Sequence, residues 1–181
     1  MSSRFATFFR NVNLGRPGSP TRTQLLRAFA AAGAGEPRSF LTHGNVVFTA
    51  PGEREAEAIA ARAAARLRRA CGLAEPGFTR GLAHLAALVA SDPFVDAPAD
   101  DVHQQTITFL PRAPRRRPTM PLVTPRRDAE VFRLDGGEAF GVIRKIGGRA
   151  GSPNALLERA LGVPATTRNW RTVVRLVERF G

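Results

Sequence analysis

Short apolar runs and longer helical repeats alternate along the first half of the chain. The apolar runs have strand length, and two of them flank a His-Gly-Asn turn, as in a β-hairpin. The longer segments place apolar residues at helical spacing. We predict strands at 5–9, 38–41, 46–49 and 78–79, and helices between Thr21 and Gly33, at 53–71 and at 82–90. This order is that of the split βαβ, ferredoxin-like motif.

The ends of the first two helices carry clear local signals. Thr21 and Gln24 form the pattern of a capping box, in which each side chain bonds the backbone of the other residue. In the segment 53–71, acidic residues come early and arginines come late, which matches the helix dipole. These signals predict where both helices begin.

The second half repeats these signals less regularly. Strands are predicted at 103–110, 130–134 and 139–144, and helices at 153–161 and near the C-terminus. Thr167, Arg168 and Asn169 are predicted to open the last helix, with Trp170 and Val173 on its core face. Residues 111–127 are rich in Pro and Arg and are predicted to form a loop.

We therefore predict an α+β protein with two ferredoxin-like (split βαβ) subdomains in one compact chain. The predicted N-terminal ferredoxin-like subdomain is 1–95. The predicted C-terminal α+β subdomain is 96–181 and contains the Pro/Arg-rich loop. A chain of 181 residues can bury a sizeable core without disulfides or a metal.

The net charge of +12 leaves two interpretations open. Such a charge attracts nucleic acid and other anions. However, Lys145 is the single lysine among 27 basic residues and tyrosine is absent, as in a genome with GC bias. Cys71 is the single cysteine, so no intramolecular disulfide is expected. With no apolar signal segment and no spanning stretch, we expect a cytoplasmic protein with no membrane partner.

Three segments carry a resemblance to a known family: 9–15 (FRNVNLG), 40–48 (FLTHGNVVF) and 148–173, which includes LGVPATTRNWRTV. The chain resembles the bacterial family called domain of unknown function 1697. The resemblance implies an α+β fold built from ferredoxin-like halves and implies no established activity. Asn11 stands where the family pattern has Gly, and Ala150-Gly151 stand where it has Ser-Lys.

Polar residues in these segments are the candidate ligand-binding residues: Arg10, Asn13, Asn45, Arg149, Thr167, Arg168 and Asn169. A helix start and several arginines favour a phosphate or a carboxylate, because free backbone N–H groups and guanidinium forks bind such anions. A structural interpretation stays open beside this one. Thr167 could cap a helix, Asn45 could serve its turn, and Arg168 could bond loop carbonyls.

Several common chemistries are missing from the sequence. Its three histidines have no metal-ligand spacing with cysteine or acidic residues, and no phosphate-binding loop or nucleophile elbow occurs. Cys71 is expected to be a buried, inert thiol. His43 is a weak candidate for acid–base catalysis. We expect no metal and no cofactor.

Our preferred hypothesis is a binding protein for an anionic ligand, either a phosphorylated small molecule or a nucleic acid. One alternative is a small enzyme with a polar Arg/Asn/His site and no metal. Another alternative is a structural or protein-interaction domain. The sequence leaves the ligand, any reaction and the oligomeric state open.

Overall fold

Five helices and eleven strands alternate along residues 2–181, the part of the chain that the computed structural model describes. The chain divides into two compact units. One extends to Ala87 and includes Leu176–Gly181, and the other is Leu88–Arg175. The boundaries fall within helices α3 (Leu82–Ala90) and α5 (Trp170–Phe180). The strands pair antiparallel in three sheets, which confirms the α+β class. The subdomain limits 1–95 and 96–181, and the ferredoxin-like description of both subdomains, stay predictions.

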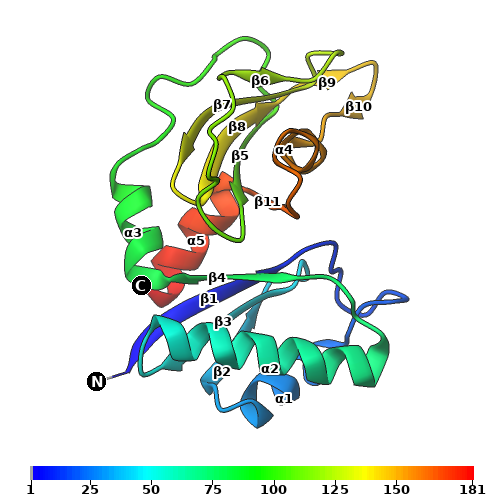
Figure 1. The fold of residues 1–181 in the computed structure, drawn as a ribbon, viewed down its shortest axis with the longest axis vertical. Coiled ribbons are helices and arrows are strands. Elements are labelled where there is room, and N and C mark those ends of the chain that lie inside the picture. Colours follow the sequence, from blue (N-terminus) through cyan, green and yellow to red (C-terminus); the bar gives the residue numbers. More distant parts are fainter. Residues whose placement is uncertain (1) are drawn as a thin grey trace. The chain divides into compact units, whose positions relative to one another are not determined.

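The first unit follows the predicted order of elements (Figure 1). Its elements are β1 (Ser3–Phe9), α1 (Arg22–Ala31), β2 (Gly35–Phe40), β3 (Asn45–Ala50), α2 (Glu53–Cys71) and β4 (Gly77–Gly81). The sheet order is β2-β3-β1-β4, with all neighbours antiparallel. This strand order is the one that a split βαβ unit produces.

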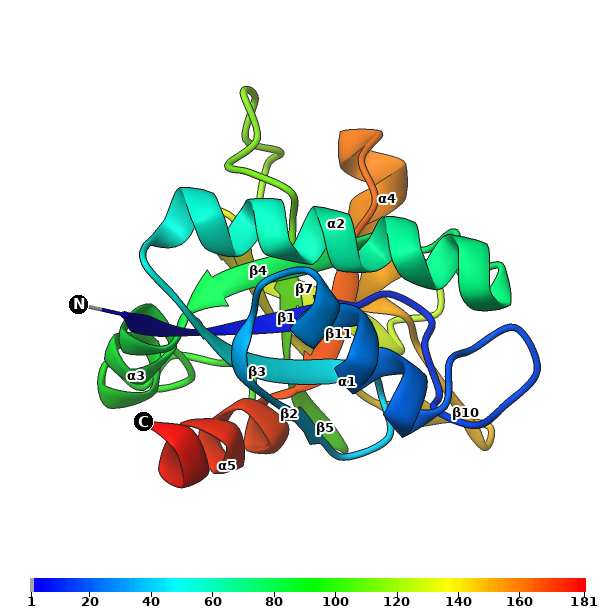
Figure 2. The ribbon, with the colours of Figure 1, turned by 90° about the horizontal axis from the view of Figure 1, so that it is seen from below.

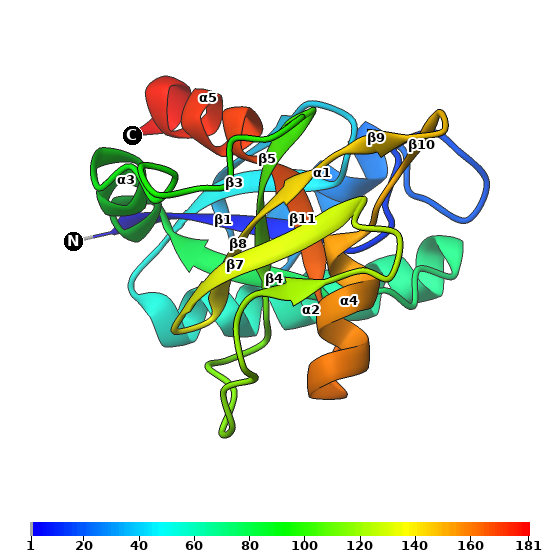
Figure 3. The same ribbon diagram turned by 90° about the horizontal axis from the view of Figure 1, so that it is seen from above.

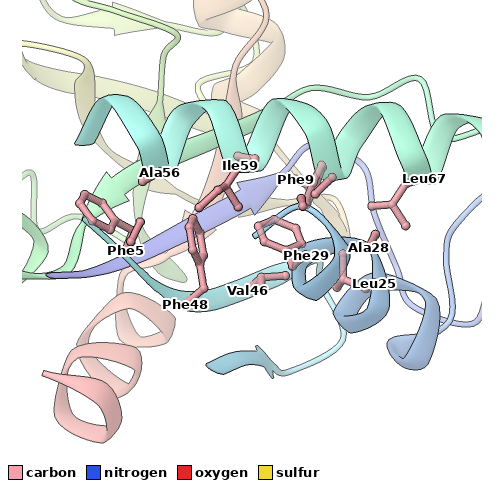
Figure 4. Close-up of a cluster of buried hydrophobic side chains, with 14 of the residues drawn as sticks. Phe5, Phe9, Leu25, Ala28, Phe29, Val46, Phe48, Ala56, Ile59 and Leu67 are labelled. Carbon is pink, nitrogen blue, oxygen red and sulfur yellow. The ribbon is translucent and has the colours of Figure 1, made fainter. Parts of the chain in front are cut away.

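Helices α1 and α2 lie over the same face of this sheet (Figure 2). Strand residues alternate between faces, so Phe5, Phe9 and Phe48 enter the core while their neighbours point away from it. Figure 4 shows these rings between α2 and the strands, with Phe29 contributed by α1. The Phe29 and Phe48 ring centroids are 5.2 Å apart. Full burial of one such side chain contributes about 1.5–3 kcal/mol.

The predicted helix ends are confirmed. The Thr21 hydroxyl accepts from the Gln24 backbone N–H at 3.2 Å, and the Gln24 side chain accepts from the Thr21 N–H at 2.8 Å. Helix α2 covers the predicted residues and ends at Gly72. A side-chain cap therefore defines the start of α1, and a left-handed glycine defines the end of α2.

The second unit is built on a five-stranded sheet with the order β11-β5-β8-β7-β6 (Figure 3). A separate small hairpin consists of β9 and β10. The elements that complete the unit are β5 (Gln104–Phe109), β6 (Leu122–Val123), β7 (Ala129–Asp135), β8 (Glu138–Ile143), β9 (Lys145–Ile146), β10 (Arg149–Ala150), α4 (Pro153–Leu161) and β11 (Thr166–Asn169).

Successive side chains of β8 point to opposite faces of the sheet and belong to two different apolar clusters. Ala139 belongs to a cluster with Leu157 of α4. Phe140, the next residue, lies among aromatic rings, with centroids 5.9 Å from Phe94 and 6.1 Å from Trp170. Successive strand residues point to opposite faces, so the sheet has a core on each side.

Two sequence predictions are wrong in this unit. Thr167 and Arg168 do not open the last helix, because their strand β11 pairs with β5 and α5 begins at Trp170. Asn169 also pairs with β5, but it directly precedes α5 and caps it, as predicted. The β ladder takes up backbone groups that an open helix end would present to a ligand. The loop 111–127 also contains a short strand, β6. Trp170 and Val173 are buried, as predicted.

Candidate functional site

Arg10, the first predicted ligand-binding residue, lies just after β1 and pairs with a carboxylate. Its Nη1 is 2.8 Å from Glu75 Oε2, and Asn11 Nδ2 donates to the other carboxylate oxygen at 3.1 Å. The Arg10 backbone N–H donates to Pro76 O at 2.9 Å. These contacts connect the end of β1 to the segment that leads into β4.

Asn45, in the β2–β3 hairpin, is fully buried. Its Nδ2 donates to Phe40 O at 3.0 Å, so the side chain closes the turn from within. His43 lies exposed in the same turn. Asn13 is exposed in the loop after β1, where its backbone N–H donates to Ser19 Oγ at 3.1 Å. The contacts of Asn45 are those of a turn-forming residue.

Arg168 lies on β11 in the second unit and is 8% exposed. Its Nη1 donates to Thr166 Oγ1 at 2.8 Å and to Thr167 O at 2.9 Å. The Thr167 hydroxyl bonds Thr108 Oγ1 at 2.7 Å and also donates to Asn154 Oδ1. Burial removes water from the guanidinium, and this desolvation lowers the pKa of Arg168 to about 10.

The remaining predicted residues also lie in the second unit. Asn169 Oδ1 accepts from the Arg171 backbone N–H at 2.9 Å and thereby caps α5. Arg149 is exposed on β10. Arg10, Asn13 and Asn45 thus belong to the first unit, and the other predicted residues belong to the second. A ligand-binding role for these residues stays a prediction, as does acid–base catalysis by His43.

The burial of Arg168 predicts a contribution to stability that increases at alkaline pH. The folded protein has the lower pKa for this group, so the unfolded chain holds the Arg168 proton to higher pH. Above about pH 9, the unfolded state therefore binds more protons, and the free energy of unfolding rises with pH. The expected contribution from Arg168 is about 1 kcal/mol at pH 11.

Urea unfolding from pH 8 to 11, on wild type and Arg168→Met, measures this contribution. Wild type should gain stability relative to the variant as the pH rises. The other titratable groups are the same in wild type and in the variant, so their contributions cancel in the difference. Arg68→Met, at an exposed arginine, is the control. A difference between wild type and Arg168→Met that stays flat or falls with pH contradicts the prediction.

A different set of arginines lines one pocket of the first unit, with a volume of about 310 Å³. Arg4 of β1 lies opposite Thr49 of β3, and Arg38 of β2 lies opposite Val47. Residues directly opposite each other point to the same face of a sheet. Val47 and Thr49 flank the core residue Phe48 on β3, so both point away from the core of Figure 4. Arg4 and Arg38 therefore lie on that face too. Arg179, near the end of α5, is the third arginine of the pocket.

Two of these arginines are held by Phe180, which also lines the pocket. Arg4 Nη1 donates to Phe180 O at 2.7 Å, and the Arg179 guanidinium lies over the Phe180 ring, 5.5 Å from its centroid. The Phe180 ring packs edge-on against Phe40 at 6.0 Å. These contacts reduce the side-chain freedom that ligand binding would otherwise have to remove.

The pocket carries a positive charge. Its lining includes three guanidinium groups, the Thr49 hydroxyl and one carboxylate, that of Glu36. Planar guanidinium forks match the geometry of phosphate and carboxylate oxygens. The arrangement can therefore bind a compact anion with charge-assisted hydrogen bonds.

Sequence reasoning missed all three pocket arginines. Arg4 directly precedes the core residue Phe5 on β1, so strand alternation predicts that its side chain points away from the core. The shared face with Arg38 emerges only when β3 is known to lie between β2 and β1. Arg179 comes from the far end of the chain, and no local pattern connects it to the other two.

Residues 2–181 contain neither a metal-ligand cluster nor a membrane-spanning helix. Over residues 2–181, no group of three or more His, Cys, Asp or Glu side chains is placed to hold a metal ion. Within the same range, no helix combines the length and the apolar character needed to cross a bilayer.

Comparison with known proteins shows the family and supports the fold. No curated protein matches the chain. The conserved bacterial protein SP0830 from Streptococcus pneumoniae has a similar structure, with a TM-score of 0.64 over 99% of this chain and 98% of that chain. The sequences are 15% identical, so this likeness concerns the fold alone. The model of the family described as protein of unknown function (DUF1697) matches residues 2–140, which include the first two segments of the resemblance. The chain therefore belongs to the DUF1697 family.

Proposed function

We propose that the protein binds a phosphorylated small molecule in the pocket of Arg4, Arg38 and Arg179. The observation that carries the proposal is the presence of three guanidinium groups from three separate elements in one pocket. A phosphoryl group offers several oxygens to such forks at once. Thr49 adds a hydroxyl that can donate to a further oxygen.

The size of the pocket favours a small ligand over a nucleic acid. Its volume lies at the lower end of the roughly 300–1,000 Å³ that is usual for small-molecule sites. Phe180 provides an apolar wall against which the body of the ligand can pack. A nucleic-acid interface would need an extended row of phosphate contacts rather than one compact group of donors.

The proposal predicts that Arg38→Ala weakens anion binding about 10- to 100-fold. A hydrogen bond to a charged partner contributes about 1.5–3 kcal/mol, and the variant lacks the Arg38 guanidinium that would donate such bonds. Isothermal titration calorimetry with pyrophosphate at near-physiological salt measures the dissociation constants of wild type and Arg38→Ala. Nucleotides and sugar phosphates then extend the series and identify the preferred body of the ligand.

Matched variants separate a specific site from net charge. Arg68→Ala removes the same charge from an exposed helix position outside the pocket. Equal weakening by Arg38→Ala and Arg68→Ala would mean that total charge alone attracts the anion. Arg10→Ala and Arg149→Ala test the residues predicted from the sequence. Loss of binding in those variants, with Arg38→Ala unaffected, would place the site there instead. Absence of binding by wild type across the series would refute the proposal.

A further inference from the structure

A second basic surface lies between helices α1 and α2, which run over the same face of the first sheet (Figure 2). The two helices border a groove of about 420 Å³. Its floor is apolar and consists of Ala28, Ala31, Leu67 and Ala70. Ala31 and Ala70 are exposed, whereas Leu67 reaches into the core below. The small side chains leave room for another element to approach both helices closely.

Three arginines border this apolar floor. Arg27 comes from α1. Arg66 and Arg69 come from α2, where their spacing of three residues makes them neighbours on one side of the helix. The lining includes no acidic residue. Arg62, one turn earlier on α2, is different because its Nη2 lies 2.7 Å from Glu55 Oε1. The positive charge of the groove is therefore not balanced by a carboxylate among its lining residues.

We propose that this groove is a docking surface for an acidic amphipathic helix of a partner protein. Apolar side chains on one face of that helix would pack on the alanines and Leu67. Glutamates or aspartates beside them would pair with Arg27, Arg66 and Arg69. Helices that bind in grooves use this combination of apolar anchors and flanking charges.

The chemistry of the floor favours a helix over a nucleic acid. Single-stranded nucleic acids bind where aromatic rings stack on the bases, and the lining of this groove contains no aromatic residue. The phosphates of a nucleic acid would contact the arginines, but its bases would find no aromatic ring to stack on over the alanine floor. An amphipathic helix satisfies both the apolar and the charged positions.

Fluorescence anisotropy with a designed peptide tests the proposal. The probe is a labelled helical peptide with leucines at i, i+4 and i+7, flanked by glutamates. Its dissociation constant is measured for full-length wild type at near-physiological salt. The Arg66→Ala/Arg69→Ala variant should bind about tenfold more weakly, because it loses two charged partners at the interface. Arg68, next to Arg69 on the same helix, does not line the groove. Arg68→Ala should therefore change the dissociation constant by less than about twofold.

Two further variants separate docking from simple attraction between charges. Ala31→Trp fills the groove without changing the charge and should weaken binding about tenfold. The Arg66→Glu/Arg69→Glu variant should prefer a peptide in which lysines replace the glutamates. Both changes are at exposed positions, and circular dichroism checks that the variants fold.

Four outcomes would overturn the proposal. The first is equal binding of a peptide with the same composition in scrambled order. The second is equal weakening by Arg68→Ala and by Arg66→Ala/Arg69→Ala. The third is displacement of the peptide by a single-stranded oligonucleotide that binds the groove more tightly. The fourth is sedimentation data in which Ala31→Trp dissociates a dimer, since a second copy of this chain would then occupy the groove.

Discussion

Replacing Phe48 with alanine is expected to lower the free energy of unfolding by about 3–5 kcal/mol. Phe48 is 1% exposed and lies at the centre of the first core. Its ring centroid is 5.2 Å from that of Phe29 and 6.2 Å from that of Phe5 (Figure 4). Truncation would remove these contacts and leave a cavity between β3 and the helices. A central strand paired on both sides cannot easily move to fill such a space.

Urea unfolding followed by far-UV circular dichroism measures the loss. Phe48→Leu is the matched control, because it keeps most of the apolar volume and should cost roughly 1 kcal/mol. A cost of less than about 1 kcal/mol for Phe48→Ala would mean that the ring is not part of a packed core. Val47 and Thr49, the neighbours of Phe48 on β3, line the arginine pocket. Pyrophosphate binding by Phe48→Leu therefore shows whether the pocket tolerates small changes in that core.

The fold of the first unit was predictable because its signals are local. Helix α2 was predicted at its observed residues from an apolar stripe, early glutamates and a final glycine. The hairpin of β2 and β3 followed from its turn. Strand β11 was missed because its strand character depends on pairing with β5, far away in the sequence. Thr166 and Thr167 favour a strand, but a short segment before a helix gives no reliable period.

The candidate site was less predictable, for a physical reason. Arg10 and Asn45 stood out because polar residues at strand ends and turns are unusual enough to suggest function. The contacts of Arg10 with Glu75 and of Asn45 with Phe40 O also account for both residues as structural. The pocket arginines resemble many other arginines in a chain with 27 basic residues. Only the order of strands and the position of Phe180 distinguish them.

The first two segments of the family resemblance meet each other in the first unit. The Phe9 N–H donates to Gly44 O at 3.0 Å, and the Leu14 N–H donates to Thr42 O at 2.8 Å. The loop after β1 is thereby joined to the β2–β3 turn. The two segments thus form a structural junction whether or not a ligand binds there. Gly44 lies within this junction, next to Val12 and Phe9.

Substitution of Gly44 by alanine is expected to lower the free energy of unfolding by about 2–5 kcal/mol, for two separate reasons. The φ angle of Gly44 is +69°, a left-handed conformation that costs a residue with a side chain roughly 1–2 kcal/mol. In addition, a Cβ at this position would lie 2.7 Å from Val12 Cβ and 3.1 Å from Phe9 Cβ. Val12 and Phe9 are buried, so relief requires movement of the backbone after β1.

Gly18→Ala isolates the first of these two terms. Gly18 has a similar φ of +75°, but a Cβ there would meet no atom within 4 Å. Its cost should therefore be about 1–2 kcal/mol, with no steric contribution. The excess cost of Gly44→Ala over Gly18→Ala measures the crowding at the junction. Adding Val12→Ala removes Val12 Cγ1, which would lie 2.8 Å from the new Cβ, but keeps Val12 Cβ. It should therefore recover only part of that excess, and a double-mutant cycle gives the coupling. Equal costs for the two glycine variants, with no coupling to Val12, would show that the two segments are not closely packed.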